Sequence, residues 1–422
     1  MQSSKPFKVS PSPLLPPLLL LMPPKAAPKA ADKAKAPAKA APAKAAPAAK
    51  AAPAKDAKAK ADPKAAAKDL KAKDAKGGAK AAAAPAAGKA DPGKAFPLEK
   101  GPTPSKMEPT DITRLYKLPD GDMKTEEDVI TKQGYAIEQK LGQGGFGTVF
   151  MARDKKKNMK VACKLCELGK EWSDARVKDM KNELFIHEKI KHLYVVKLYL
   201  HFLTQSSNGN RLYLFMELAD GGDFSKFCAK KGMIPEKEAK LYYAQIACGV
   251  NHMHSLGIAH RDIKLQNVLL AKCTTSISGD FTCLLADFGL SRLLHHEGAA
   301  VALQKTVCGT PLFMSPELQQ KKPYNGFEAD VWALGITIYI MMTTEVPFDF
   351  KNMAAAKQAM LDQKWSWPED KMKEKPSADL KELLTLMLQP VPEKRIKMPE
   401  MLAHKWVDEA FKKAQDAANK AK

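Results

Sequence analysis

The segment HRDIKLQN, residues 260–267, places an acid, a cation and an amide within one short stretch that leads into the apolar run VLL. Asp262 is a candidate general base, with Lys264 two positions and Asn267 five positions after it. Arg261 directly precedes the aspartate. By itself the segment is also compatible with a polar turn that leads into a strand, so its interpretation depends on the rest of the chain.

The surrounding sequence predicts a sheet-rich part followed by a helical part. Short alternating runs predict strands at 135–141, 147–154 and 159–165, and a fully apolar run of strand length lies at 212–218. Apolar residues at helical spacing predict helices at 235–257 and 377–388, a nearly all-apolar run predicts a buried helix at 331–342, and a further helical stretch is expected at 173–191. We therefore expect an α+β, bilobal fold in which a small sheet-rich lobe precedes a larger helical lobe.

The N-terminal quarter of the chain differs in composition from the rest. The first 100 residues hold 21 Lys, no Arg and 7 acidic residues, so +14 of the net charge of +21 lies there. Recurrent prolines prevent a continuous helix, and large apolar side chains are scarce. We predict a disordered tail over 1–110, a linker over 111–132, a folded domain over 133–408 and a short basic helix or tail over 409–422.

The tail is compatible with weak electrostatic contact with nucleic acid or an acidic partner, and its composition resembles that of linker-histone tails. Because it lacks arginine and is poor in aromatic residues, a solvated spacer is the simpler interpretation. The apolar run 14–22 is split by prolines and is too short to span a bilayer, and Met22 is an alternative start. The odd number of cysteines predicts free thiols, and we expect a cytoplasmic or nuclear protein without a transmembrane segment.

Gly142, Gly144 and Gly147 form a GxGxxG pattern before Val149. Glycines let the backbone approach phosphates closely, and the flanking strands predict a hairpin that covers them. An ordinary glycine-rich turn is the alternative. A dinucleotide-binding loop is disfavoured because strand-like residues follow where that motif requires a helix.

Three further positions suit phosphate and metal binding. Lys164 in VACK ends a predicted strand, and Glu183 follows 19 residues later in a predicted helix. A lysine held by a carboxylate can bind the α- and β-phosphates of a nucleotide, although an ordinary solvated ion pair is the alternative, and Glu188 is a competing partner. Asp287 in ADFGLSR, at the end of a strand, is a candidate metal ligand together with Asn267.

Residues 133–408 resemble the eukaryotic protein kinase family, through LGQGGFGTVF, VACK, HRDIKLQN, DFG, ADVWALG and an SPE in place of the usual APE. Lys264 and the pair Gly309-Thr310 are typical of serine/threonine kinases rather than tyrosine kinases. The resemblance implies transfer of the γ-phosphate of ATP, with Mg²⁺, to Ser or Thr hydroxyls of protein substrates.

The resemblance also implies a role for each motif residue. Asp262 would be the base, Lys264 would neutralise the transferring phosphoryl group, Lys164 and Glu183 would hold the phosphates, and Asn267 and Asp287 would bind the metal. The implied ATP-binding residues are Leu141, Gly142, Gly144, Gly145, Phe146, Gly147, Val149, Ala162, Lys164, Met216 as gatekeeper, Glu217, Leu218 and Ala219. Structural roles are implied for Thr310, Glu317, Asp330 and Arg395, with an ion pair between Arg395 and Glu317.

Three departures from the family pattern stand out. His187 occupies a position where a packing aliphatic residue is usual, which predicts a less firmly held helix. Ser315 replaces the alanine of APE, a mild change that we expect the fold to tolerate. Asp287 lies 20 positions after Asn267, which implies a hairpin insertion at 273–283, similar to that of autophagy-initiating kinases; calmodulin-dependent-type kinases are the alternative subfamily.

Thr306 is the candidate regulatory position. An unpaired Arg261 near other cations would disfavour an ordered activation segment, and a phosphate on Thr306 could pair with it. The alternative is an ordinary exposed threonine.

Two rival functions are a pseudokinase scaffold, disfavoured because every motif residue is present, and a chromatin- or RNA-binding protein in which the tail carries the function.

Overall fold

The computed structural model describes residues 115–117, 123–144, 147–169, 174–206, 209–272, 281–294 and 301–421. The predicted tail at 1–110, Gly145, Phe146 and most of the expected insertion at 273–283 lie outside these residues. In the part of the chain that is described, no helix is long and apolar enough to cross a membrane.

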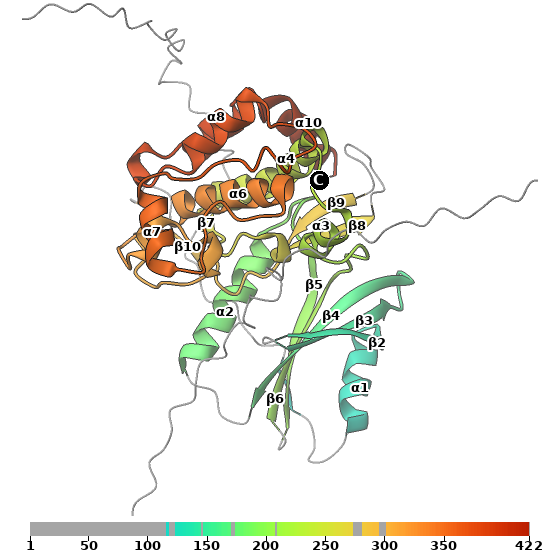
Figure 1. Ribbon diagram of the computed structural model, residues 1–422. Helices are drawn as coiled ribbons and strands as arrows, with labels where there is room; N and C mark the ends of the chain where they lie inside the picture. The colour runs from blue at the N-terminus through green and yellow to red at the C-terminus, as the bar shows by residue number, and fades with distance from the viewer. Residues whose placement is uncertain are drawn as a thin grey trace, which may run out of the picture. The chain divides into compact units, whose positions relative to one another are not determined.

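A six-stranded sheet forms the N-terminal lobe, with the order β1-β5-β6-β4-β3-β2 (Figure 1). The five neighbouring strands from β5 to β2 are antiparallel, and the four predicted strands are confirmed. The strand at 147–154 has the predicted bounds, those predicted at 135–141 and 159–165 extend a few residues further, and the one predicted at 212–218 begins three residues earlier and ends one residue earlier. Alternating apolar residues suit such a sheet because its two faces bury different side chains. The bounds are β1 (Leu115–Lys117), β2 (Tyr135–Gly144), β3 (Gly147–Asp154), β4 (Met159–Gly169), β5 (Leu198–Ser206) and β6 (Gly209–Glu217).

Two helices lie on opposite faces of this sheet (Figure 1). α1 (Met123–Lys132) buries Val129 and Ile130 against a cluster that includes Phe202 and Phe215. On the other face, Met180 and Leu184 of α2 (Asp174–Lys189) pack against leucines of β5 and β6. The lobe therefore carries α2, the helix of Glu183, on an apolar surface that sets its distance from the sheet.

The segment 111–132, predicted as a linker, instead contains an edge strand and a helix. β1 pairs in parallel with β5. Glu126 of α1 is buried and accepts hydrogen bonds from Thr204 Oγ1 at 2.8 Å, Arg211 NH1 at 2.6 Å and Tyr213 OH at 3.0 Å. A buried carboxylate requires such partners, so this segment is part of the folded lobe.

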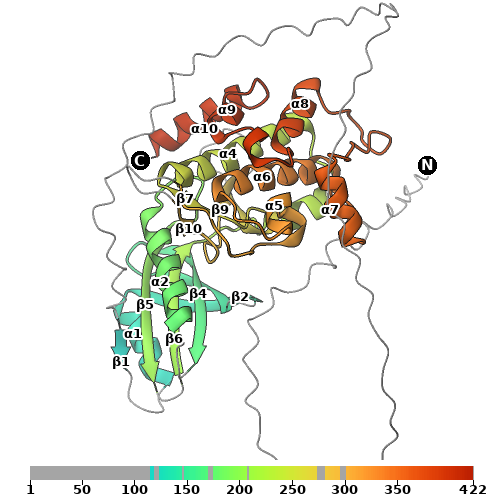
Figure 2. The same cartoon turned by 90° about the vertical axis from the view of Figure 1, so that its left-hand side faces the viewer.

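The C-terminal lobe is helical, as predicted, and its core is built around two nearly buried helices, α4 and α6 (Figure 2). The segment 409–422, predicted as a short basic helix or tail, is largely helical as part of α10, where Tyr194 OH donates to the Ala414 carbonyl at 3.2 Å. The bounds are α3 (Phe224–Lys231), α4 (Glu236–Ser255), β7 (Ile258–Ala259), β8 (Val268–Lys272), β9 (Phe281–Leu285), β10 (Arg292–Leu293), α5 (Pro316–Gln319), α6 (Gly326–Thr343), α7 (Met353–Leu361), α8 (Ala378–Met387), α9 (Met398–Leu402) and α10 (Asp408–Lys420).

The described cysteines are free, as expected. Cys163 and Cys166 have CxxC spacing, but both lie on β4, where residues three apart point to opposite faces. β8 and β9 form the antiparallel hairpin that the long spacing between Asn267 and Asp287 implies.

Candidate active site

A cavity of about 530 Å³ lies where residues of the sheet, of α2 and of the 260–288 region meet. This volume is within the range of small-molecule sites, which is about 300–1,000 Å³. Most of the predicted ATP-binding and metal-binding side chains line it. They are Leu141, Gly147, Val149, Ala162, Lys164, Glu183, Met216, Glu217, Leu218, Ala219, Asn267 and Asp287.

The glycine-rich turn is a hairpin between β2 and β3, with Gly144 opposite Gly147 and Gly142 opposite Val149. Gly147 has a φ of 132°, and an added Cβ would collide with the Leu165 carbonyl oxygen. Only glycine fits this position, where the backbone of β3 lines the cavity.

Lys164 and Glu183 meet at the inner wall of the cavity. Lys164 Nζ lies 3.4 Å from Glu183 Oε1, and both side chains are largely buried. Burial alone would lower the pKa of Lys164, but the carboxylates of Glu183 and Asp287 outweigh it and hold the pKa above its ordinary value. Glu188, the competing partner, instead lies 3.3 Å from His201 Nδ1.

Asp287 follows the end of β9 in a left-handed conformation, with a φ of 66°. Such a φ is uncommon for residues other than glycine and is typical of functional sites. The Ala286 amide donates to the Asn267 carbonyl at 2.9 Å, which brings the two candidate metal ligands together.

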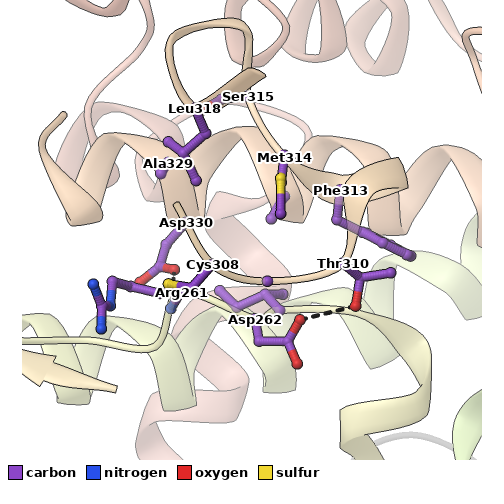
Figure 3. A pocket seen from close by; sticks show the side chains of 13 residues that line it. Arg261, Asp262, Cys308, Thr310, Phe313, Met314, Ser315, Leu318, Ala329 and Asp330 are labelled. Carbon is purple, nitrogen blue, oxygen red and sulfur yellow. Dashed lines mark hydrogen bonds between the residues drawn. The ribbon is translucent and has the colours of Figure 1, made fainter. Parts of the chain in front are cut away.

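Asp262 is buried and is held by three side chains. Its Oδ1 accepts from Thr310 Oγ1 at 3.0 Å, and its Oδ2 accepts from Lys264 Nζ at 2.9 Å and Asn267 Nδ2 at 3.0 Å. Lys264 also donates to Thr310 Oγ1 at 2.6 Å. Thr310, Asp262 and Lys264 therefore contact one another, and Figure 3 shows the bond between Thr310 and Asp262.

Asp330 of α6 fixes the backbone of the loop that carries Asp262. Its Oδ2 accepts from the His260 amide and its Oδ1 from the Arg261 amide, each at 2.8 Å. Figure 3 shows Asp330 and Arg261 beside a small cavity that Ser315 also lines. Arg261 has a φ of 64°, so this buried carboxylate stabilises a backbone turn that is otherwise costly.

The Arg261 side chain is not unpaired, contrary to the sequence-based expectation. Its Nε donates to the Leu290 carbonyl at 2.7 Å, and its NH1 donates to Gln304 Oε1 at 3.3 Å and Tyr324 OH at 3.2 Å. Burial raises the pKa of Tyr324 to about 12, so the phenol stays protonated and donates to the Thr306 carbonyl at 3.0 Å. The neutral side chains of Gln304 and Tyr324 thus already connect Arg261 to the activation segment, the stretch between the DFG and SPE motifs.

The expected ion pair between Arg395 and Glu317 is present and buried, with two contacts of 2.9 Å. The guanidinium also lies 5.2 Å from the ring centroid of Trp332. This bidentate pair anchors the end of the activation segment to the helical core.

Several cavity residues were not found from the sequence as ligand-contacting positions. Leu214, Leu269 and Ala286 lie in apolar runs that indicate a core equally well. The other positions are His187, Val196 and Phe288. His187 departs from the family pattern and Phe288 belongs to the DFG motif, but neither was assigned a contact with a ligand from the sequence.

A family model described as the protein kinase domain matches residues 135–407. The chain belongs to the protein kinase family. It is 31% identical over 280 residues to human testis-specific serine/threonine-protein kinase 1, covering 66% of this chain and 73% of that protein. It is also 30% identical over 292 residues to mouse testis-specific serine/threonine-protein kinase 2, covering 69% and 78%.

A plant relative is similar over the same region. CBL-interacting serine/threonine-protein kinase 18 of Arabidopsis thaliana is 32% identical over 281 residues, covering 66% of this chain and 50% of that protein. These relatives, together with the family match, identify a serine/threonine protein kinase that acts on protein substrates. The finer resemblance to autophagy-initiating kinases stays a prediction.

Proposed function

We propose that this kinase binds Mg-ATP in the 530 Å³ cavity and transfers the γ-phosphate to Ser or Thr side chains at Asp262. In this assignment Leu141, Val149 and Ala162 contact the faces of the adenine ring. The hinge residues Glu217 to Ala219, which connect the two lobes, bind the edge of the ring, and Met216 directly before them is the gatekeeper. The glycine-rich hairpin covers the phosphates. Lys164, held by Glu183, binds the α- and β-phosphates.

The donor set fits Mg²⁺. No cluster of three or more His, Cys, Asp or Glu side chains suited to a metal occurs among the described residues. Mg²⁺ instead suits a site with one or two protein ligands, because it retains waters and binds phosphate oxygens. Asn267 Nδ2 donates to Asp262, which leaves Oδ1 of the amide to ligate the ion beside Asp287. Bound Mg²⁺ would neutralise charge on the phosphates.

Asp262 acts as the proton acceptor in this assignment. The bond between the γ-phosphorus and the ADP oxygen breaks, a new bond forms to the substrate hydroxyl oxygen, and the hydroxyl proton moves to the Asp262 carboxylate. Lys264 lies 2.9 Å from that carboxylate and adds positive charge where the phosphoryl group passes. Thr310 holds the other carboxylate oxygen, so Asp262 is fixed in one orientation.

One observation supports this proposal above all: four motif side chains, separated by up to 123 positions along the chain, line one cavity, and the candidate base is hydrogen-bonded to one of them. The four are Lys164, Glu183, Asn267 and Asp287, and Asp262 accepts from Asn267 Nδ2 at 3.0 Å. A pseudokinase scaffold has no need for an oriented base. The test is a peptide library incubated with the full-length kinase, ATP and Mg²⁺. We expect phosphate on Ser and Thr and none after chelation of the metal; nucleotide binding without transfer would favour the pseudokinase.

The same library tests substrate preference. Kinases that select arginine near the target line the peptide groove with acids; by resemblance Asp223 supplies one such charge, while Gln266 and Ile340 stand at two others. Asp223 is already paired with Lys226 Nζ at 2.9 Å. We therefore expect that a flanking arginine changes kcat/KM by less than about fivefold, the effect of a partly exposed ion pair. A dominant arginine requirement would overturn this prediction.

Thr306 remains the proposed regulatory position. Its side chain is exposed, and its carbonyl belongs to the Tyr324 and Arg261 network. Because that network already contacts the segment, a phosphate would reinforce existing order. We expect Thr306→Ala to lower kcat/KM about three- to tenfold relative to phosphorylated kinase. Mass spectrometry after incubation with ATP and Mg²⁺ establishes whether Thr306 is phosphorylated. A kinase without substitutions that is fully active while Thr306 is unphosphorylated would contradict the regulatory role of Thr306.

We also retain as proposals a weak contact of the basic tail with nucleic acid or an acidic partner, and a cytoplasmic or nuclear location. The tail contact is measured by a salt titration of the full-length kinase on DNA, because electrostatic binding weakens steeply as salt rises.

A further inference from the structure

One face of α2 contacts the segment that begins with Asp287. Asn182 Nδ2 donates to the Ser291 carbonyl at 2.9 Å, and Arg292 NH2 lies 2.7 Å from Asp179 Oδ1. Asp179, Asn182 and Glu183 are spaced by three and four residues, so they share a face of the helix. The residue one turn further along that face is His187.

His187 makes two contacts that a packing aliphatic residue would not reproduce. Its Nε2 lies 2.8 Å from the Val196 carbonyl oxygen, and its ring centroid lies 4.7 Å from that of Phe288. A carbonyl oxygen only accepts, so Nε2 carries the proton and donates. Burial lowers the pKa of His187 to about 4, which keeps the ring neutral at pH 7 and in this tautomer.

The acceptor of that bond belongs to the framework that supports Asp287. The Val196 amide donates to the Leu285 carbonyl at 2.9 Å, and Val195 forms a parallel bridge with Leu285. Leu285 is two residues before Asp287. His187 thus bonds α2 to the backbone that precedes Asp287, and its ring contacts the residue that follows Asp287.

We propose that His187 is a positioning residue that fixes α2, and with it Glu183, relative to Asp287. This inference rests on the proposed function, because Glu183 acts through Lys164 on the phosphates. It also reverses the expectation that a histidine at this position loosens the helix. A hydrogen bond from His187 to the Val196 carbonyl restrains both the position of α2 along its axis and its rotation about that axis, whereas an aliphatic side chain would only pack against its neighbours.

The contacts predict which kinetic constant changes. The hydrogen bond and the ring contact of His187 go to Val196 and Phe288 rather than to the hinge residues 217–219, so adenine binding should be preserved. The alignment of Lys164 and Asp287 with the phosphates matters most in the transition state. Loss of an interaction made chiefly in the transition state lowers kcat rather than raising KM.

The test compares three variants of the full-length kinase. His187→Leu introduces the aliphatic side chain that is usual at this position and removes the donor; His187→Gln keeps a donor at a similar reach. Glu188→Gln is the matched control, because Glu188 is the next residue of α2 but points to His201. The measurements are kcat and KM for ATP with one peptide, Mg-ATP binding by calorimetry and the melting temperature.

We expect His187→Leu to lower kcat about tenfold, the effect of one lost buried hydrogen bond, with KM changed less than about threefold. His187→Gln should recover most of that loss, and Glu188→Gln should match the unmodified kinase. Unchanged or higher kcat in His187→Leu would overturn the inference. The inference would also be overturned if His187→Gln lost as much kcat and as much melting temperature as His187→Leu, since that result indicates that His187 acts through packing alone.

The same measurements distinguish an error in the proposed function from an error in this inference. If the unmodified kinase binds Mg-ATP but transfers no phosphate, the assignment of the active site is wrong and the inference falls with it. If the unmodified kinase is active and His187→Leu matches it, only the positioning role is lost.

Discussion

Replacing Asp262 with asparagine is expected to lower kcat by about 10²–10⁴-fold and to leave Mg-ATP binding close to that of the unmodified kinase. The substitution removes the carboxylate that accepts the hydroxyl proton. Shape is nearly conserved, and the side-chain carbonyl can still accept from Thr310. The side-chain bonds of Asp262 hold it beside Lys264 and Thr310, where the phosphoryl group is transferred, so its charge should affect transfer rather than nucleotide affinity. The measurements are steady-state phosphate transfer and calorimetric binding of Mg-ATP.

Asp379→Asn is the matched control for this experiment. Asp379 is partly exposed on α8 and pairs with Lys405 at 2.9 Å, far along the chain from the motif residues. The same chemical change there should leave both kcat and affinity unchanged. Near-normal turnover in Asp262→Asn would show that another group accepts the proton, and a parallel loss of Mg-ATP binding would show that Asp262 contributes to nucleotide affinity.

The lobes were predictable because each strand and helix carries its own periodic pattern. The helices α4 and α8 were expected within a few residues of their observed ends, since caps and apolar spacing are local signals. α1 was missed for the opposite reason. Its buried carboxylate, Glu126, looks like a surface residue in the sequence, and its partners Thr204 and Tyr213 are 78 and 87 positions away.

The contacts of the candidate site likewise divide into local ones, which the sequence predicts, and long-range ones, which it does not. Motif spacing predicted Asp262, Lys264 and Asn267 together because they share one loop, and their mutual hydrogen bonds follow from that loop's geometry. The environment of Arg261 was not predictable. The acceptors Gln304 and Tyr324 lie 43 and 63 positions away and belong to no motif, so the sequence left the guanidinium without partners.

His187 shows the limit most clearly. Its residue type indicated a departure from the family pattern, but the sequence gives no sign of the Val196 carbonyl that accepts its proton. Backbone acceptors are the same at every position, and only the tertiary fold brings one to this ring. An unusual residue in a motif is therefore better treated as a candidate for a new contact than as a defect.

Replacing Asp287 with asparagine should abolish phosphate transfer by a route different from that of Asp262→Asn. Asparagine tolerates the left-handed backbone that Asp287 adopts, so the variant removes a charge without adding strain. We expect Mg-ATP affinity to fall at least about tenfold and kcat to fall with it, because the metal loses its charged ligand.

Thermal unfolding separates the two variants directly. A ligand that binds only the folded kinase raises its melting temperature, so Mg-ATP should stabilise the unmodified kinase and Asp262→Asn alike. In Asp287→Asn this Mg-dependent stabilisation should be largely lost, while Lys164 retains Glu183 and metal-free ATP binding changes little. An Asp287→Asn variant that keeps the full Mg-dependent shift would mean that the metal is held elsewhere, and the assignment of Asn267 and Asp287 as its ligands would be wrong.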